Sequence, residues 1–190
     1  MPLTTLDPRT ALVVVDLQHG VVTTPTAHPM GDVVARSAAL AAAFRDRGLP
    51  VVLANVTGLA PGRTDAQQSG PSRPPRPPGW AELVAELAVS DADLLVTKQR
   101  WGAFIGTSLH ERLQELGVTQ VVLTGVATSA GVESTARSAY DHGYHVVLVT
   151  DAMTDRSAEA HDHSVERVFP RLGETTTTAE VLAGLRPAAP

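Results

Sequence analysis

The chain has 190 residues, contains no cysteine and carries a formal net charge of −5 at pH 7. This length suits one well-buried domain, residues 1–190, better than two. The negative charge argues against nucleic acid as a partner, which needs clustered Lys and Arg, and the lack of cysteine excludes disulfide bonds, cysteine-ligated zinc and every thiol mechanism.

Short apolar runs alternate with amphipathic stretches along the chain. The apolar runs are predicted strands, at Ala11–Val15, Val51–Val56, Leu94–Thr97, Gln120–Thr124, His145–Thr150 and Thr175–Thr177. The amphipathic stretches are predicted helices, at Val33–Arg47, Trp80–Ala88, Ser108–Leu116, Gly131–His142, Ser157–Leu172 and Ala179–Leu185. Strands that are apolar throughout and alternate with helices indicate a parallel sheet with helices on both faces. We therefore predict an α/β fold, a three-layer αβα sandwich with about six strands.

Residues 57–79 interrupt this alternation, because they are rich in Pro, Gly, Arg and Ser and run into the sequence SRPPRPPGW. Such a segment can be a flexible linker or a polyproline ligand for another domain. In a compact domain, however, a long loop is often a lid or a binding loop. We predict a lid at the edge where the strands end, with Arg73, Arg76 and Trp80 near the site.

Polar side chains follow the predicted strands at their carboxyl ends, where ligands bind in open parallel sheets. Asp16 follows the first strand and Lys98 the third, and the fourth strand runs through residues 125–131 directly into a helix. Taken singly, Asp16 could cap a turn and Lys98 could be a surface lysine. A buried Asp–Lys pair is costly unless it is functional or fully hydrogen-bonded, so their convergence favours a functional site.

Three runs of the sequence carry a resemblance: ALVVVDLQ, then VTKQRWGAF, then VVLTGVATSAGVESTARSAYDHGYHVVLVTDAM. In this order and spacing they resemble the isochorismatase-like (cysteine hydrolase) superfamily, and the likeness extends from Thr10 to about Leu185. The resemblance implies a Rossmann-like sheet in the strand order 3-2-1-4-5-6 and a homodimer or larger homo-oligomer. It also implies a non-proline cis peptide at Val126–Ala127.

The same resemblance implies an active site built from Asp16, Lys98 and the loop after the fourth strand. Most relatives carry a cysteine nucleophile where this chain has Gly131, whereas true isochorismatases resemble this chain in having glycine there. Their reaction implies Asp16 as a general acid that protonates an enolpyruvyl (vinyl) ether. Lys98 would orient Asp16 or bind a carboxylate, and Gly131 would leave room for substrate or water. We expect further substrate contacts from Gln18, Trp101, Phe104, Val126, Ala127, Thr128 and Ser129.

The isochorismatase pattern is matched only in part, because isochorismatases tend to have His-Ile where this chain has Ser129-Ala130. Isochorismate is therefore a candidate substrate, and two other functions stay open. One is C–N hydrolysis of an amide or urea by Ser129 or an activated water, although we expect the Ser129 hydroxyl to bond locally to the first turn of the helix. The other is a non-catalytic family member that binds a ligand or serves in assembly.

No cofactor is expected. A dinucleotide site is rejected because G-x-G-x-x-G is missing and the second strand delivers Asn55, not an acid. A metal is not expected either: His161 and His163 face apart on a helix, and a solvated helix face explains them better. No apolar run approaches the length of a membrane span, and MPLTTLDPRT lacks a signal-peptide pattern. We therefore expect a cytoplasmic protein with a small-molecule substrate and no membrane partner.

Overall fold

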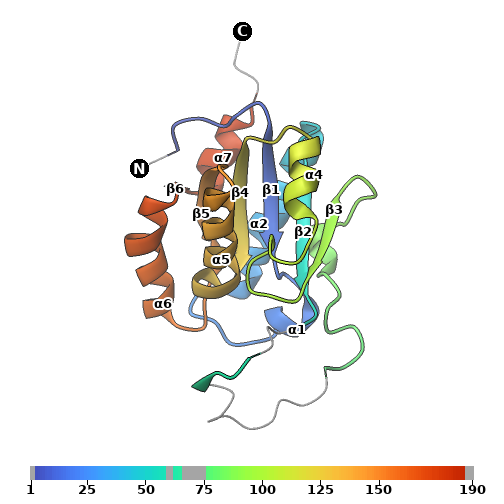
Figure 1. Ribbon diagram of the computed structural model, residues 1–190, viewed down its shortest axis with the longest axis vertical. Helices are drawn as coiled ribbons and strands as arrows, with labels where there is room; N and C mark the ends of the chain where they lie inside the picture. Colours follow the sequence, from blue (N-terminus) through green and yellow to red (C-terminus); the bar gives the residue numbers. More distant parts are fainter. Residues whose placement is uncertain (1–2, 59–61, 66–75, 187–190) are drawn as a thin grey trace.

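One parallel sheet organises the molecule. The computed structural model describes residues 3–58, 62–65 and 76–186, and within them six strands pair in the order β3-β2-β1-β4-β5-β6 (Figure 1). The strands are β1 Thr10–Val15, β2 Val51–Val56, β3 Leu94–Lys98, β4 Gln120–Val126, β5 His145–Thr154 and β6 Glu174–Thr176. The predicted fold class and strand order are confirmed.

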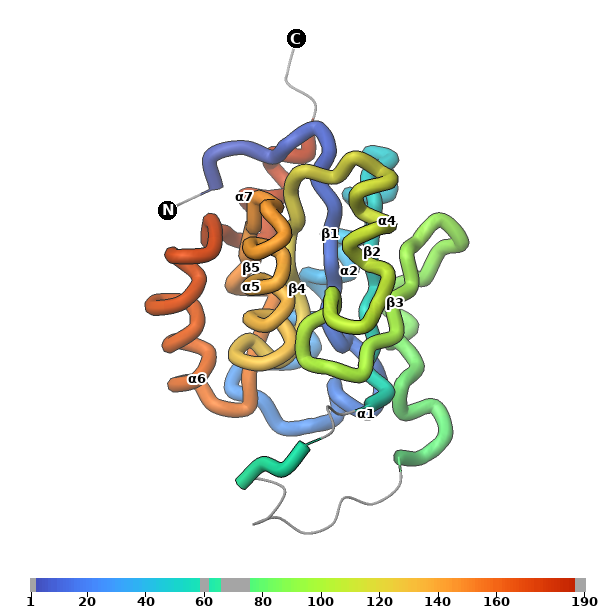
Figure 2. Tube along the Cα trace, in the orientation of Figure 1, coloured from blue at the N-terminus to red at the C-terminus, as the bar shows by residue number. Residues whose placement is uncertain are grey.

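Helices cover both faces of this sheet. They are α1 His19–Val22, α2 Met30–Asp46, α4 Leu109–Glu115, α5 Glu133–Asp141, α6 Ala158–His163 and α7 Thr178–Gly184. Shorter helical turns are η1 Ala85–Leu87, η2 Thr128–Val132, η3 Ser164–Val168 and η4 Phe169–Arg171. In Figure 2, α4 and α5 lie in front of the strands and α2 lies behind them. In the described part of the chain, none of the helices combines the length and the apolar character needed to cross a membrane.

Strand β1 is buried along its whole length because it lies in the middle of the sheet. Successive side chains of a strand point to opposite faces. Val13 and Val15 therefore pack in the core that includes α4 and α5, whereas Leu12 and Val14 pack in the core that includes α2 and α7. The strand order reverses between β1 and β4, so their carboxyl ends flank the position where open α/β sheets bind ligands.

One of the predicted helices is wrong, and another is present but changes its helix type along its length. The segment predicted as a helix at Trp80–Ala88 contains only the short turn η1. Its backbone instead forms hydrogen bonds with the chain that follows β1. The amide of Gly20 donates to the Trp80 carbonyl at 2.8 Å, and the Val84 amide donates to the Leu17 carbonyl at 3.1 Å. The helix predicted over residues 157–172 is divided into α6, η3 and η4. Most of the predicted lid, Arg73 included, lies outside the described residues.

Gly125 in β4 provides a test of this packing. Its φ is +109°, and a Cβ built there would collide with the backbone of Val15 on the neighbouring strand. We expect Gly125→Ala to cost at least about 3 kcal/mol of unfolding free energy, measured by urea denaturation.

Gly31→Ala is the matched control, because a Cβ on Gly31 in α2 meets nothing within 4 Å. We expect this variant to keep its stability or to gain up to about 1 kcal/mol. Equal losses in the two variants would contradict the assigned packing of β4 on β1.

Candidate active site

Asp16 leaves β1 in a conformation that is unusual for a non-glycine residue. Its φ is +55°, in the left-handed region, and its amide donates to the Ala54 carbonyl at 2.8 Å. Such backbone geometry is concentrated at functional sites, where the surrounding structure enforces it. The sheet therefore ends at Asp16 with a turn that directs the chain out of the sheet.

Asp16 forms a buried ion pair with Lys98, which ends β3. The Lys98 Nζ donates to Asp16 Oδ2 at 2.7 Å, and the Lys98 side chain is 1% exposed. The same ammonium donates to the Arg100 carbonyl at 3.1 Å, whereas Asp16 Oδ1 has no hydrogen-bond partner among the described residues. The structure thus brings the two sequence-predicted charges into direct contact.

Burial dominates the electrostatics of this carboxyl group. Desolvation raises the pKa of Asp16 to about 6, although the charge and the hydrogen bond of Lys98 both act to lower it. The protonated fraction of Asp16 near neutral pH is therefore larger than that of an ordinary Asp. A carboxyl group with this pKa can deliver a proton near neutral pH.

The turn after β4 places Gly131 against this acid. The Val126–Ala127 peptide is cis, as the family resemblance implied, and η2 follows it directly. A Cβ built on Gly131 would lie 3.3 Å from Asp16 Oδ2 and 3.1 Å from the Val126 carbonyl oxygen. Contacts this short mean that a side chain here would have to displace its neighbours, so the glycine allows the turn to pack closely against the carboxyl group. Asp16 and Gly131 both line the cavity described next.

A cavity of about 230 Å³ opens onto these residues. Among the described residues, its charged lining is Asp16, Arg76, Lys98, Arg100 and Arg156, so four cationic side chains and one carboxyl group share the cavity. Apolar lining comes from residues such as Val21, Met30, Val56, Trp80 and Trp101. Because the whole chain carries a net charge of −5, this local excess of positive charge favours an anionic ligand.

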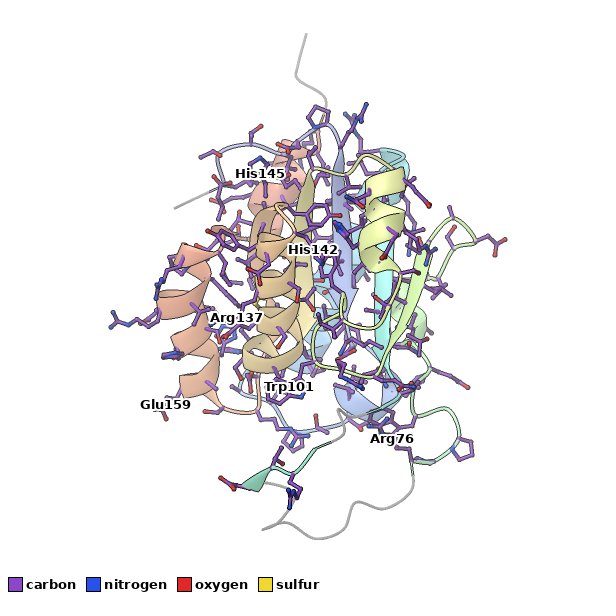
Figure 3. The ribbon with its side chains drawn as sticks, in the orientation of Figure 1. Arg76, Trp101, Arg137, His142, His145 and Glu159 are labelled. Atoms are coloured by element: carbon purple, nitrogen blue, oxygen red, sulfur yellow. The ribbon has the colours of Figure 1, made fainter. Side chains whose placement is uncertain are left out.

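Trp101, Val126 and Ala127, for which we predict substrate contacts, line the cavity. Trp101 is 64% exposed, and Figure 3 shows it with Arg76 at the end of the molecule where the strands terminate. Arg76 lies over the ring of Trp80, 4.0 Å from its centroid. Arg76 and Trp80, which belong to the predicted lid, thus contribute to the wall of the cavity.

Gln18, Phe104, Thr128 and Ser129 do not line this cavity. The Gln18 amide bonds the backbone of Val56 and the Trp80 carbonyl, which ties the end of β1 to its neighbours. The Phe104 ring packs beside those of His142 and Tyr144. Any effect of these four residues on substrate binding would therefore be indirect.

Ser129 does not bond locally to its own helix, so that expectation is wrong. Its hydroxyl and its amide both donate to Asp155 Oδ2, each at 2.8 Å. The neighbouring Thr128 hydroxyl lies 2.9 Å from Nδ1 of His161, which is 7% exposed. The predicted solvated helix face is therefore wrong for His161, whereas His163 is exposed. Burial lowers the pKa of His161, which favours the neutral ring.

The end of β5 contributes site residues that the sequence analysis missed. The strand continues to Thr154, beyond the predicted end at Thr150, and this extension brings Thr154 and Arg156 to the cavity. The signal was present in the polar run after the apolar core of the strand, TDAMTDR. Among the described residues, no group of three or more His, Asp or Glu side chains is placed to hold a metal ion.

A parallel α/β sheet with a buried acid–ammonium pair in a cavity at its switch point has the arrangement of an enzyme. A profile of the isochorismatase domain family matches residues 10–180. The chain therefore belongs to the isochorismatase family.

Similar proteins agree with this assignment. An uncharacterised isochorismatase family protein of Bacillus subtilis, YwoC, is 40% identical over 92% of this chain and 93% of its own length. The structure of an isochorismatase family protein from Burkholderia thailandensis matches with a TM-score of 0.89 and 44% identity, over 95% of this chain and 97% of that chain.

More distant relatives are named for two reactions. A probable isochorismatase of Pseudomonas chlororaphis is 30% identical, over 93% of this chain and 87% of its own. Maleamate amidohydrolase of Pseudomonas putida is 29% identical, over 94% of this chain and 87% of its own. Both names denote hydrolases, and the chain is an isochorismatase-family hydrolase.

Lys98→Met tests the ion pair through its pH dependence. Without the ammonium, the pKa of Asp16 rises further, so keeping the buried carboxyl ionised costs more as pH increases. We expect a loss of about 3–5 kcal/mol in unfolding free energy at pH 8 and a clearly smaller loss at pH 5, measured by urea denaturation. The double variant Lys98→Met/Asp16→Asn should lose this pH dependence. A loss that is equal at both pH values would contradict the pair.

Proposed function

We propose that this chain hydrolyses an enolpyruvyl (vinyl) ether without a nucleophilic side chain, with Asp16 as the general acid. The position of Gly131 next to Asp16 in the wall of the cavity carries the proposal. By the family resemblance, Gly131 stands where thiol members have their cysteine. A Cβ built at this position would lie 3.3 Å from Asp16 Oδ2. Because Asp16 and Gly131 both line the cavity, a substrate or water bound there can reach the acid, and residue 131 offers no nucleophilic side chain to attack it.

The state of Asp16 supports this role. Its pKa of about 6 is close to the value at which a general acid works well near neutral pH. Lys98 orients the carboxyl group through the bond to Oδ2. In a thiol mechanism Asp16 would act as a base and would need to be ionised, so the raised pKa favours acid catalysis.

The charge of the cavity supports an anionic substrate. Arg76, Arg100 and Arg156 line it, and guanidinium groups bind carboxylates with two hydrogen bonds. An enolpyruvyl ether carries at least one carboxylate. Isochorismate, which carries two, remains the candidate substrate.

The proposed reaction balances without a cofactor. Asp16 gives its proton to the terminal vinyl carbon, and an oxocarbenium ion forms at the carbon that bears the ether oxygen. Water adds to this carbon and loses a proton, which restores Asp16 to its acid form. The hemiketal then breaks its bond to the ether oxygen, which takes the hydroxyl proton, and pyruvate and an alcohol leave.

C–N hydrolysis is the second candidate, because maleamate amidohydrolase is among the relatives. Ser129 is poorly suited as its nucleophile, since the hydroxyl donates to Asp155 and the residue does not line the cavity. An activated water would then have to replace the thiol. A non-catalytic role is the third candidate, but none of the contacts described in the cavity favours it.

Turnover assays with two readouts test the proposal. The protein and its Asp16→Asn and Ser129→Ala variants are incubated with isochorismate and with a panel of carboxamides and ureas, and pyruvate and ammonia are followed separately. We expect pyruvate release that falls by at least about 100-fold in Asp16→Asn and largely persists in Ser129→Ala. Ammonia release, or loss of activity in Ser129→Ala alone, would favour C–N hydrolysis instead.

The pH dependence provides a second test. A general acid must be protonated, so kcat should fall as pH rises through the pKa of Asp16, about 6, by about tenfold per unit above it. If Asp16 acts as a base, kcat should instead rise through the same range. A pH–rate profile in buffers of constant ionic strength distinguishes the two roles.

We also propose a homodimer or larger homo-oligomer, as the family resemblance implied, and a cytoplasmic location, which was expected from the lack of a signal-peptide pattern. Light scattering of the purified chain measures the assembly directly. A monomer at micromolar concentration would rule it out.

A further inference from the structure

Asp155 is a buried carboxylate that the proposed reaction does not use. It follows β5, is 6% exposed, and has no Lys, Arg or His nitrogen within 4.0 Å in the described part of the chain. A buried carboxylate without a cation is costly unless several donors compensate it. The position of those donors indicates the function of the residue.

The two carboxylate oxygens of Asp155 bind Ser129, which precedes Ala130 in the cavity wall, and Arg156, which lines the cavity. Oδ2 accepts from the amide and the hydroxyl of Ser129, each at 2.8 Å, and Oδ1 accepts from the amide of Arg156 at 2.7 Å. The Asp155 carbonyl also accepts from the Ala27 amide at 2.8 Å. One residue therefore connects the turn with Gly131, the chain that carries Arg156, and the loop that precedes α2.

The helix that carries Gly131 lacks a cap of its own. Ala127 is the residue before η2 and makes no side-chain cap bond, so the first amides of the helix need acceptors from elsewhere. Asp155 supplies one for Ser129, and the buried His161 holds the adjacent Thr128. Two consecutive residues of the turn are thus anchored from outside the cavity.

We propose that Asp155 is a positioning residue that holds the Gly131 turn against Asp16 and fixes Arg156 relative to it. The acid and the anion-binding arginine lie on different strand ends, and their separation must match that between the vinyl carbon and the carboxylate of the substrate. Misplacement by about 1 Å costs roughly 100-fold in rate. The expected effect on the rate rests on the proposed function, whereas the role of Asp155 in holding the turn does not.

Asp151 offers a matched control on the same strand. Its Oδ1 accepts from the amide and the hydroxyl of Thr178 at 2.8 and 2.9 Å, so it caps α7 in the way that Asp155 caps η2. Asp151 does not line the cavity around Asp16. Asp151 also lies 3.7 Å from Arg36 Nε and its side chain is a third exposed, whereas Asp155 is buried. Asp155→Asn and Asp151→Asn each remove one charge and alter an acceptor at a helix N-terminus, but only the first does so at the site.

The first measurement needs neither substrate nor turnover. The pKa of Asp16 is followed by carboxyl carbon NMR and assigned with Asp16→Asn. We expect about 6 in the parent and in Asp151→Asn, and a value nearer the ordinary one in Asp155→Asn, because water reaches Asp16 when the turn loosens. An unchanged pKa in folded Asp155→Asn overturns the proposal.

The second measurement is kinetic, with the enolpyruvyl ether as substrate and with thermal denaturation to confirm that each variant is folded. We expect Asp155→Asn to lower kcat by about 10- to 100-fold and to raise KM, while Asp151→Asn leaves both unchanged. Equal effects in the two variants reduce Asp155 to a structural cap and overturn the proposal. If the parent shows no turnover, the proposed reaction fails, and the NMR measurement alone decides the role of Asp155.

Discussion

The hydrogen bond between Asp16 and Lys98 is the interaction on which the site depends. Neither charge could be buried alone without a large cost in free energy, so the strands that carry them must end at the same level. β2 lies between β1 and β3, and the pair therefore constrains three strands at once. The shape of the cavity follows from this alignment of strand ends as much as from the loops that surround it.

Each strand end supplies a different component of the site. β1 supplies the acid and β3 the ammonium, while β4 leads through the cis peptide into the turn that packs Gly131 against the acid. β5 supplies both an arginine and the carboxylate that caps the turn. A parallel sheet brings these groups together because all its carboxyl ends lie on one edge, and this explains how residues far apart in the chain form one cavity.

Much of this arrangement could be predicted from the sequence, and the failures have physical causes. Apolar runs that alternate with helices predicted the sheet, and the parallel topology placed Asp16, Lys98 and Gly131 on one edge. The buried position of His161 could not be predicted, because its partner lies 33 residues away and helical spacing shows only local neighbours. Ser129 was misassigned for the same reason: a carboxylate 26 residues away replaced the local bonds that its own helix could offer.

The chain has two tryptophans, and both line the cavity. Their emission therefore comes entirely from the site, with no background from elsewhere in the chain. Trp101 is largely exposed, so a soluble quencher should reach it readily, whereas Trp80 lies under a guanidinium group. The protein thus contains its own optical reporter of occupancy, and compounds could be screened for binding without a label and before any reaction is known.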